Sequence, residues 1–168
     1  MFYDARSLTS FSGGDLSSLT NGEYMFSNAS ITSFSSDLSS LTNGYYMFNF
    51  CRNLTTFTSD LTSLTNGENM FEYCTSLTTF DSDLSSLTNG YYMFQNCKLD
   101  APSVKNIIDT INTYSGTLTL GIGCLNTTED KDLFAQEVGY ADMTSLLAAL
   151  QAKGWTVTAE YNGRPTTT

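Results

Sequence analysis

Few residues of this 168-residue chain could carry out catalysis, and the residue types that the sequence lacks exclude the largest number of possible catalytic and metal sites. The sequence contains no histidine, which excludes Ser-His-Asp and Cys-His catalysis and every zinc site that needs an imidazole. No two of the four cysteines lie close enough in sequence for a Cys-x-x-Cys metal or redox site. We therefore predict that the protein is not an enzyme and that it binds no metal and no cofactor.

Aromatic residues could instead make contacts, and they occupy positions that change between copies of a repeated sequence. The pair before each Met-Phe reads Glu-Tyr, Tyr-Tyr, Glu-Asn and Tyr-Tyr, and the pair after it reads Ser-Asn, Asn-Phe, Glu-Tyr and Gln-Asn. A position that accepts both Asn and Tyr is a poor candidate for the core, so these rings are expected on a surface suited to protein or glycan contact. The candidate surface consists of Tyr24, Tyr45, Tyr46, Phe50, Tyr73, Tyr91 and Tyr92. Alternatively, the rings lie flat on neighbouring coils and only cover the solenoid.

The cysteines of the repeat allow two interpretations. Cys51, Cys74 and Cys97 recur every 23 residues, and stacked coils would bring them close enough for a disulfide. However, Ala5 and Ala29 occupy the same position in other copies. Alanine replaces a small buried thiol but not half of a disulfide, so buried free thiols are the favoured interpretation.

An aspartate also recurs once in each copy, as Asp15, Asp37, Asp60 and Asp83. Each stands just before a short Leu- and Ser-rich segment, where its side-chain oxygen can accept hydrogen bonds from exposed backbone N–H groups. The other interpretation is a bound cation such as calcium, which needs several oxygen ligands. One or two acids in each copy are too few for that, so capping is favoured.

The elements that must position these residues come from an internal repeat of about 23 residues. LTNG begins at Leu19, Leu41, Leu64 and Leu87, and MF begins at Met1, Met25, Met47, Met70 and Met93. One interval is a residue short because SNASIT, after the second MF, has one residue fewer than NFCRNLT, after the third. A single coil cannot bury its apolar side, but coils stacked about 4.8 Å apart can. We predict an α/β repeat solenoid, leucine-rich-repeat-like, with about four 22–24-residue coils, short strands at LTTF, Asn-Gly turns with positive φ and mostly irregular returns.

The motif MFxxCxxLTxF, followed by L, L, G and MF, resembles the BspA-type leucine-rich repeat. It is most similar to the MF-rich variants of bacterial surface proteins and phage tail-associated proteins. The resemblance covers residues 1–99 and implies a solenoid used in adhesion and binding, with no catalytic residues. Because Met1 and Phe2 already form an MF pair, the first copy starts in the middle of a repeat. This predicts either a fragment of a longer protein or an N-terminal coil packed against another copy or domain.

Residues 100–168 break the pattern and are expected to form an α/β cap that continues the sheet, with a loose tail over 163–168. Apolar spacing predicts helices in PSVKNIIDTINTYSG, TTEDKDLFAQEV and MTSLLAALQAKG, the last with Asp142 as its N-cap and Gly154 just after its end. Alternation predicts strands in TLTLGIG and WTVTAEY.

The net charge of −10, from 17 acidic and 7 basic residues, argues against nucleic acid as a partner. Arg6 and Arg52 are the only basic residues before Lys98. The sequence has no run of about 18 apolar residues, so we expect no insertion into a membrane. The predicted function is a non-enzymatic extracellular binding or adhesion module, on a bacterial cell surface or a phage virion, that recognises a protein or glycan on a cell surface. The alternative is a structural spacer that stacks through its uncapped N-terminal coil.

Overall fold

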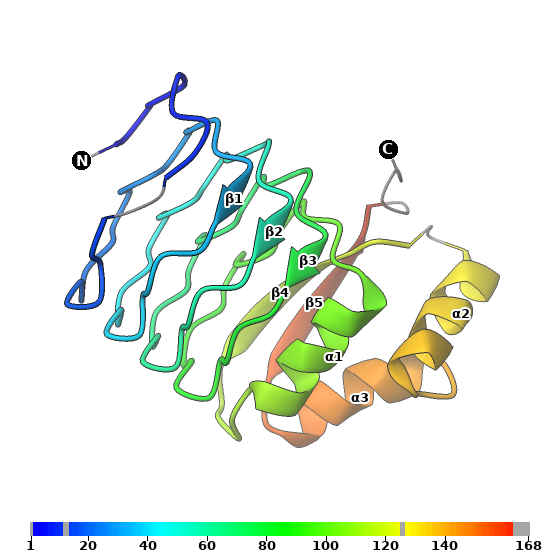
Figure 1. The fold of residues 1–168 in the computed structure, drawn as a ribbon. Helices are drawn as coiled ribbons and strands as arrows, with labels where there is room; N and C mark the ends of the chain where they lie inside the picture. Colours follow the sequence, from blue (N-terminus) through cyan, green and yellow to red (C-terminus); the bar gives the residue numbers. More distant parts are fainter. Residues whose placement is uncertain (1, 12–13, 125–126, 163–168) are drawn as a thin grey trace.

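The computed structural model describes residues 2–11, 14–124 and 127–162, and it shows stacked coils followed by helices and two longer strands (Figure 1). The elements are β1 (Ser33–Phe34), β2 (Thr56–Phe57), β3 (Thr79–Phe80), α1 (Ala101–Thr110), β4 (Thr117–Ile122), α2 (Thr128–Val138), α3 (Met143–Ala152) and β5 (Thr156–Tyr161). The first coil and the α-helices lie at opposite ends of the stack. The expected loose tail at 163–168 lies outside the described residues.

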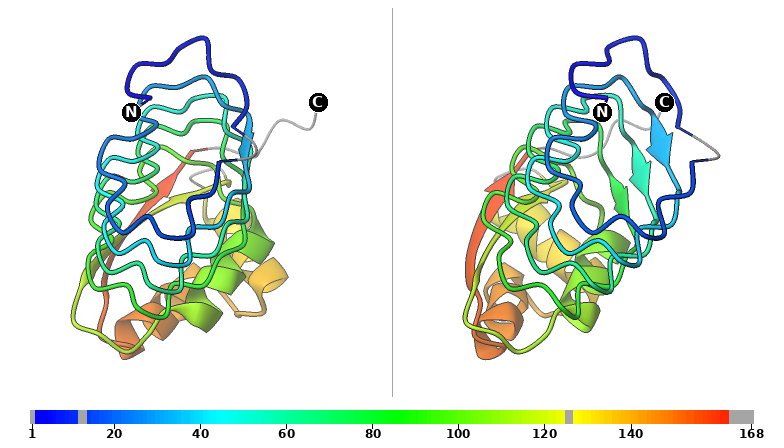
Figure 2. Two further views of the ribbon diagram at one scale, coloured as in Figure 1. Left: turned by 60° about the vertical axis from the view of Figure 1, so that its left-hand side comes forward. Right: turned by 90° about the vertical axis from the view of Figure 1, so that its left-hand side faces the viewer.

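One wall of the solenoid is the parallel sheet β1-β2-β3, whose strands pair one repeat apart. Phe34 is paired with Phe57, and Phe57 with Phe80, so identical residues face each other from coil to coil. The right-hand view of Figure 2 shows this wall as a row of short arrows on one side of the coils. The strands are short because the chain turns away after two residues in every coil.

A second ladder runs through the LTNG segments. Asn21, Asn43, Asn66 and Asn89 form parallel bridges, and their side-chain amides bond each other from coil to coil at 3.0–3.2 Å. The prediction that Asn-Gly makes a positive-φ turn was wrong, because no residue of these described pairs has a positive φ. The glycine is required for space instead: a Cβ on Gly44 would lie 2.7 Å from Sδ of Met70 in the next coil.

The core between the walls is built from stacked phenylalanines. Phe48 lies parallel to Phe71 at 5.6 Å and meets Phe57 edge-on at 5.4 Å, and the same arrangement repeats in the neighbouring coils. These rings are fully buried. Each aromatic pair adds about 0.5–1.5 kcal/mol to the free energy of burial.

The repeated cysteines are buried free thiols, as predicted. Sγ of Cys51 donates to the carbonyl of Phe26 at 3.1 Å, and Cys74 and Cys97 make the same bond one coil further along. Burial raises the pKa of Cys51 to about 12 and that of Cys74 well above its usual value. All three thiols are therefore protonated at neutral pH.

The aspartate ladder caps backbone N–H groups, as predicted. The carboxylates of Asp15, Asp37, Asp60 and Asp83 each accept a hydrogen bond from the backbone N–H two residues later, at 2.6–3.0 Å. Within the described residues, no group of three or more His, Cys, Asp or Glu side chains is placed to hold a metal ion.

The predicted helices and strands of the C-terminal third are present, but they do not continue the sheet β1-β2-β3. Strands β4 and β5 form a separate parallel pair, and β4 bridges to the second ladder through Gly90 and Leu118. Helix α1 instead lies next to β3, in the place of a further strand, and there Oγ of Ser103 accepts the Phe80 N–H at 2.8 Å. Pro102 in the first turn of α1 has no N–H to give to a sheet, which favours a helix there.

The side of the last coil opposite α1 is closed by side chains of the C-terminal strands. Oγ1 of Thr119 accepts the Tyr92 N–H at 3.1 Å, and the carboxylate of Glu160 accepts the Asn96 N–H and the Gln95 side-chain amide at 3.0 Å each. In the inner coils such backbone N–H groups bond to the next coil. Thr119 and Glu160 therefore replace the acceptors of an absent further coil.

Gly44→Ala is expected to lower the free energy of unfolding by about 1–3 kcal/mol, because the new Cβ overlaps with Met70. Urea denaturation followed by circular dichroism measures the loss. The double variant Gly44→Ala/Met70→Ala is expected to cost less than the sum of the two single changes. Strict additivity would contradict the close-contact explanation.

Native protein is expected to leave Cys51, Cys74 and Cys97 unmodified by iodoacetamide at neutral pH, because only an accessible thiolate reacts. After unfolding in urea, each of the three should be alkylated. Peptide mass spectrometry reports each position separately. Rapid modification of any of them without unfolding would show that the thiols are accessible.

Candidate binding surface

The seven predicted aromatic residues lie in turn segments that flank the Met-Phe pairs at residues 23–28, 45–50, 68–73 and 91–96. Within each of the first three segments, every second backbone N–H donates to a carbonyl of the next coil. In the first segment Tyr24 donates to Tyr45 at 3.0 Å, Phe26 to Met47 at 2.9 Å and Asn28 to Asn49 at 2.7 Å. The backbone that carries the rings is therefore held by bonds to the next coil.

Two positions of each segment have positive φ, which is uncommon for residues other than glycine. One is the residue before Met, with φ of 53–56° at Tyr24, Tyr46, Asn69 and Tyr92. The other is the second residue after Phe, with φ of 59–62° at Asn28, Phe50, Tyr73 and Asn96. Asparagine tolerates this region well, which explains why it alternates with aromatic residues there. The positive φ therefore explains why asparagine occurs at these positions, but it does not explain why aromatic residues occur there.

The rings form three clusters rather than one continuous patch. The first, which we call the tyrosine cluster, consists of Tyr3, Tyr24, Tyr45 and Tyr46, with neighbouring centroids 4.5–6.2 Å apart. The second is Phe50 with Tyr73, stacked at 4.5 Å, and the third is Tyr91 with Tyr92 at 3.8 Å. Tyr24, Tyr73 and Tyr91 are exposed, and the other four predicted rings are half-buried. The rings therefore pack on each other and still reach solvent.

Acidic and amide side chains separate the tyrosine cluster from Tyr91 and Tyr92. The Glu72 carboxylate accepts from the side-chain amides of Asn49 at 2.9 Å and Asn69 at 2.8 Å. The Glu68 carboxylate accepts from the amide of Asn89 at 3.0 Å. The surface is therefore a row of aromatic clusters divided by a fixed polar network.

The hydroxyls of Tyr24, Tyr46 and Tyr91 have raised pKa values and are neutral at physiological pH. Partial desolvation raises the pKa of Tyr24, with Tyr45 as the next cause, and it raises that of Tyr46, with the Glu72 carboxylate next. A hydrogen bond to Tyr92 is the main cause of the raised pKa of Tyr91. Neutral phenols can both donate and accept, which suits contact with hydroxyls or amides of a partner.

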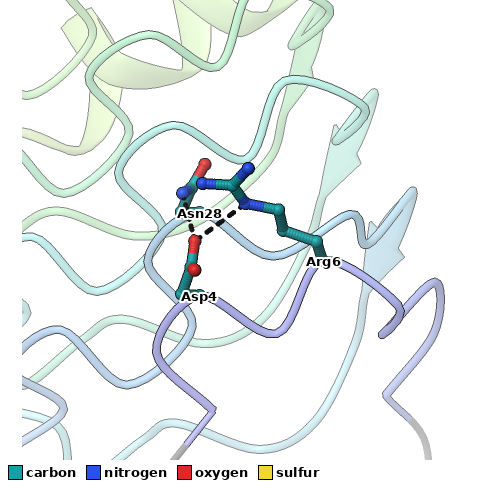
Figure 3. A network of polar contacts seen from close by, with 3 residues as sticks. All are labelled: Asp4, Arg6 and Asn28. Atoms are coloured by element: carbon teal, nitrogen blue, oxygen red, sulfur yellow. Dashed lines mark hydrogen bonds and ion pairs between the residues drawn. The ribbon is translucent and has the colours of Figure 1, made fainter.

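Sequence reasoning missed a group of residues beside the rings. Arg6, Asn28 and Arg52, together with the predicted Phe50, line a surface depression of about 380 Å³ and a second, overlapping one of about 410 Å³. Figure 3 shows Asp4 between Arg6 and Asn28, which both donate to its carboxylate. The sequence does contain one indication of this group, because Arg6 and Arg52 are the only basic residues before Lys98.

Within residues 2–11, 14–124 and 127–162, no helix is both long and apolar enough to cross a membrane.

Tyr46→Asn is expected to leave the free energy of unfolding within about 1 kcal/mol, because Asn69 holds the same position with the same backbone conformation. Tyr46→Val is expected to lower it by about 1–2 kcal/mol, since a β-branched residue rarely adopts positive φ. Chemical denaturation of both variants measures the difference. Equal stability of the two would contradict the role assigned to the backbone.

Comparison with known proteins yields one result. The model of the BspA type leucine-rich repeat region matches six copies over residues 1–116, which is more than half of the chain. No curated protein matches the chain, and no solved structure does. The matched region contains all three short strands, helix α1 and every predicted aromatic residue. The chain therefore belongs to the BspA-type leucine-rich repeat family.

Proposed function

We propose that this protein is a non-enzymatic extracellular binding module that recognises a protein or glycan through its repeat surface. Repeats of this family are generally binding scaffolds that mediate protein interactions, and the proteins that carry them are typically surface-associated. The proposal extends this to adhesion by a bacterial surface protein or to receptor binding by a phage virion. The observation that carries it is the row of solvent-reaching aromatic clusters at positions that vary within an otherwise constant repeat.

The rigidity of the rings supports a binding role. Tyr24 lies parallel to Tyr46 at 5.0 Å, and both have backbone N–H groups bonded to the next coil. A side chain that is already ordered loses little conformational entropy when a partner binds. Tyrosine in particular offers a large contact area, few rotatable bonds and a hydroxyl at its tip. These clusters therefore suit a contact site that is formed before the partner arrives.

A structural spacer is the second candidate, and the first coil favours it. Phe2 is 37% exposed, and Leu8, Phe11, Leu16 and Leu19 are only partly buried. The residues at the same repeat positions in the next coil are at most 2% exposed: Phe26, Ile31, Phe34, Leu38 and Leu41. This partly open apolar face would suit another copy or domain stacked on the N-terminal coil.

Glycan and protein arrays test the first candidate. The fourfold variant Tyr45→Ser, Tyr46→Asn, Tyr91→Ser and Tyr92→Asn is expected to weaken binding to the array ligand by about tenfold or more, because aromatic anchors dominate contact energies. Asn is chosen where φ is positive so that the fold is kept. Tyr114→Ser is the matched control, since Tyr114 is 46% exposed and lies outside the repeat surface.

The fourfold variant and a sedimentation experiment together separate the binding module from the structural spacer. Unchanged ligand binding by the fourfold variant would overturn the role of the tyrosines. If no array ligand binds, sedimentation at rising protein concentration tests the spacer. Self-association that Leu8→Asp abolishes would then favour stacking through the first coil.

A further inference from the structure

The second coil is one residue shorter than its neighbours where it leaves the Met-Phe pair. The first and third coils read MFYDARSL and MFNFCRNL there, whereas the second reads MFSNASI. In the first and third coils this stretch makes a tight turn: the Arg6 N–H donates to the carbonyl of Asp4, and the Arg52 N–H to that of Phe50, both at 2.8 Å. The second coil lacks the residue needed for this turn, so its surface is recessed between two projecting neighbours.

The two overlapping depressions lie at this recess. Ala29 and Ser30 of the short coil line one of them, and Arg6 and Arg52 of the flanking coils line both. Volumes of about 380 and 410 Å³ fall within the range of small-molecule sites. The missing residue therefore accounts for a site large enough for about one sugar ring.

The charge of this site is opposite to that of the protein. Arg6 and Arg52 hold the same repeat position two coils apart, about 10 Å between their Cα atoms from the coil spacing. Asp4 lies 2.9 Å from Arg6 and offsets its charge. Arg52 forms no ion pair among the described residues, and its guanidinium lies 5.3 Å from the centre of the Phe50 ring. One uncompensated positive charge is thus held over an aromatic ring in a chain of net charge −10.

Most of the remaining lining is uncharged and polar. Ser27, Asn28, Ser30 and Asn53 contribute hydroxyls and amides, which can bond the hydroxyls of a ligand. Phe50 adds an apolar surface that continues onto Tyr73, stacked on it at 4.5 Å. An acidic peptide side chain would use only the arginine. A ligand with one anionic group and several hydroxyls would use the whole lining.

We propose that this depression binds a carboxylate-bearing saccharide, with Arg52 as the anchor for the carboxylate. The planar guanidinium forms two parallel hydrogen bonds with a carboxylate, while the amides and hydroxyls contact the sugar hydroxyls. This inference rests on the proposed binding function and names its ligand chemistry. It adds a second site beside the tyrosine cluster, whose Tyr3 also lines one of the depressions.

Titration calorimetry with trigalacturonate and its methyl ester tests the proposal. Native protein is expected to bind the acid and to bind the uncharged ester at least about tenfold more weakly, as loss of a charge-assisted bond predicts. Arg52→Gln should weaken acid binding by a similar factor, and Arg52→Lys by less. Lys105→Gln removes the same charge on α1 and should have no effect.

A second variant tests the origin of the depression. Insertion of one asparagine between Ala29 and Ser30 restores the length of the other coils and should abolish acid binding while leaving both arginines in place. Equal binding of acid and ester, preference for a sulfated trisaccharide, or undiminished binding by Arg52→Gln would each overturn the proposal. So would the absence of acid binding by native protein.

Failure of this inference is distinguishable from failure of the proposed function. The fourfold tyrosine variant alters no residue that lines the depressions, so it should bind trigalacturonate normally. If native protein ignores trigalacturonate but the fourfold variant loses its array ligand, only the saccharide site is wrong. If the array also shows no ligand, the binding function fails as well.

Discussion

The structure depends on one backbone pattern: residues of positive φ at two positions of each turn segment. Because of this pattern, every second N–H of the segment points along the stack, and in the first three segments it bonds to the next coil. The coils can then lie close enough for identical side chains to stack, as the phenylalanines and thiols do. The same closeness excludes a side chain at Gly22, Gly44 and Gly67, where a Cβ would come within 2.8 Å of a methionine sulfur.

Much of the fold could be predicted because it follows periodic patterns. The repeat predicted stacked coils, and apolar spacing predicted the three helices and strands β4 and β5. The Asn-Gly turn was misassigned because the need for glycine comes from the neighbouring coil, 23 residues away, and not from local φ. The separate pairing of β4 and β5 depends on which wall the chain joins after α1, and no local pattern encodes that choice. The number of coils and the division at residue 99 stay predictions.

The candidate surface was predictable to a similar extent. Variation between repeats located the rings in the turn segments, but their division into clusters depends on side-chain contacts such as that of Glu72 with Asn49 and Asn69. The arginines were missed because they counted only toward net charge. Their shared repeat position and the one-residue deletion between them become informative once the coils are stacked.

The hydrogen bonds between coils have a consequence for the electrostatics of a longer stack. On the turn side, Tyr24 and Phe26 donate forward to the following coil, whereas Thr32 and Thr55 of the strand wall donate backward to the preceding one. The peptide dipoles of the turn segments therefore oppose those of the strand wall, unlike those of an α-helix, which add up along its axis. Such a tube can gain coils without accumulating a macrodipole, so its ends acquire no growing attraction for ions, and its surface charge is set by side chains alone.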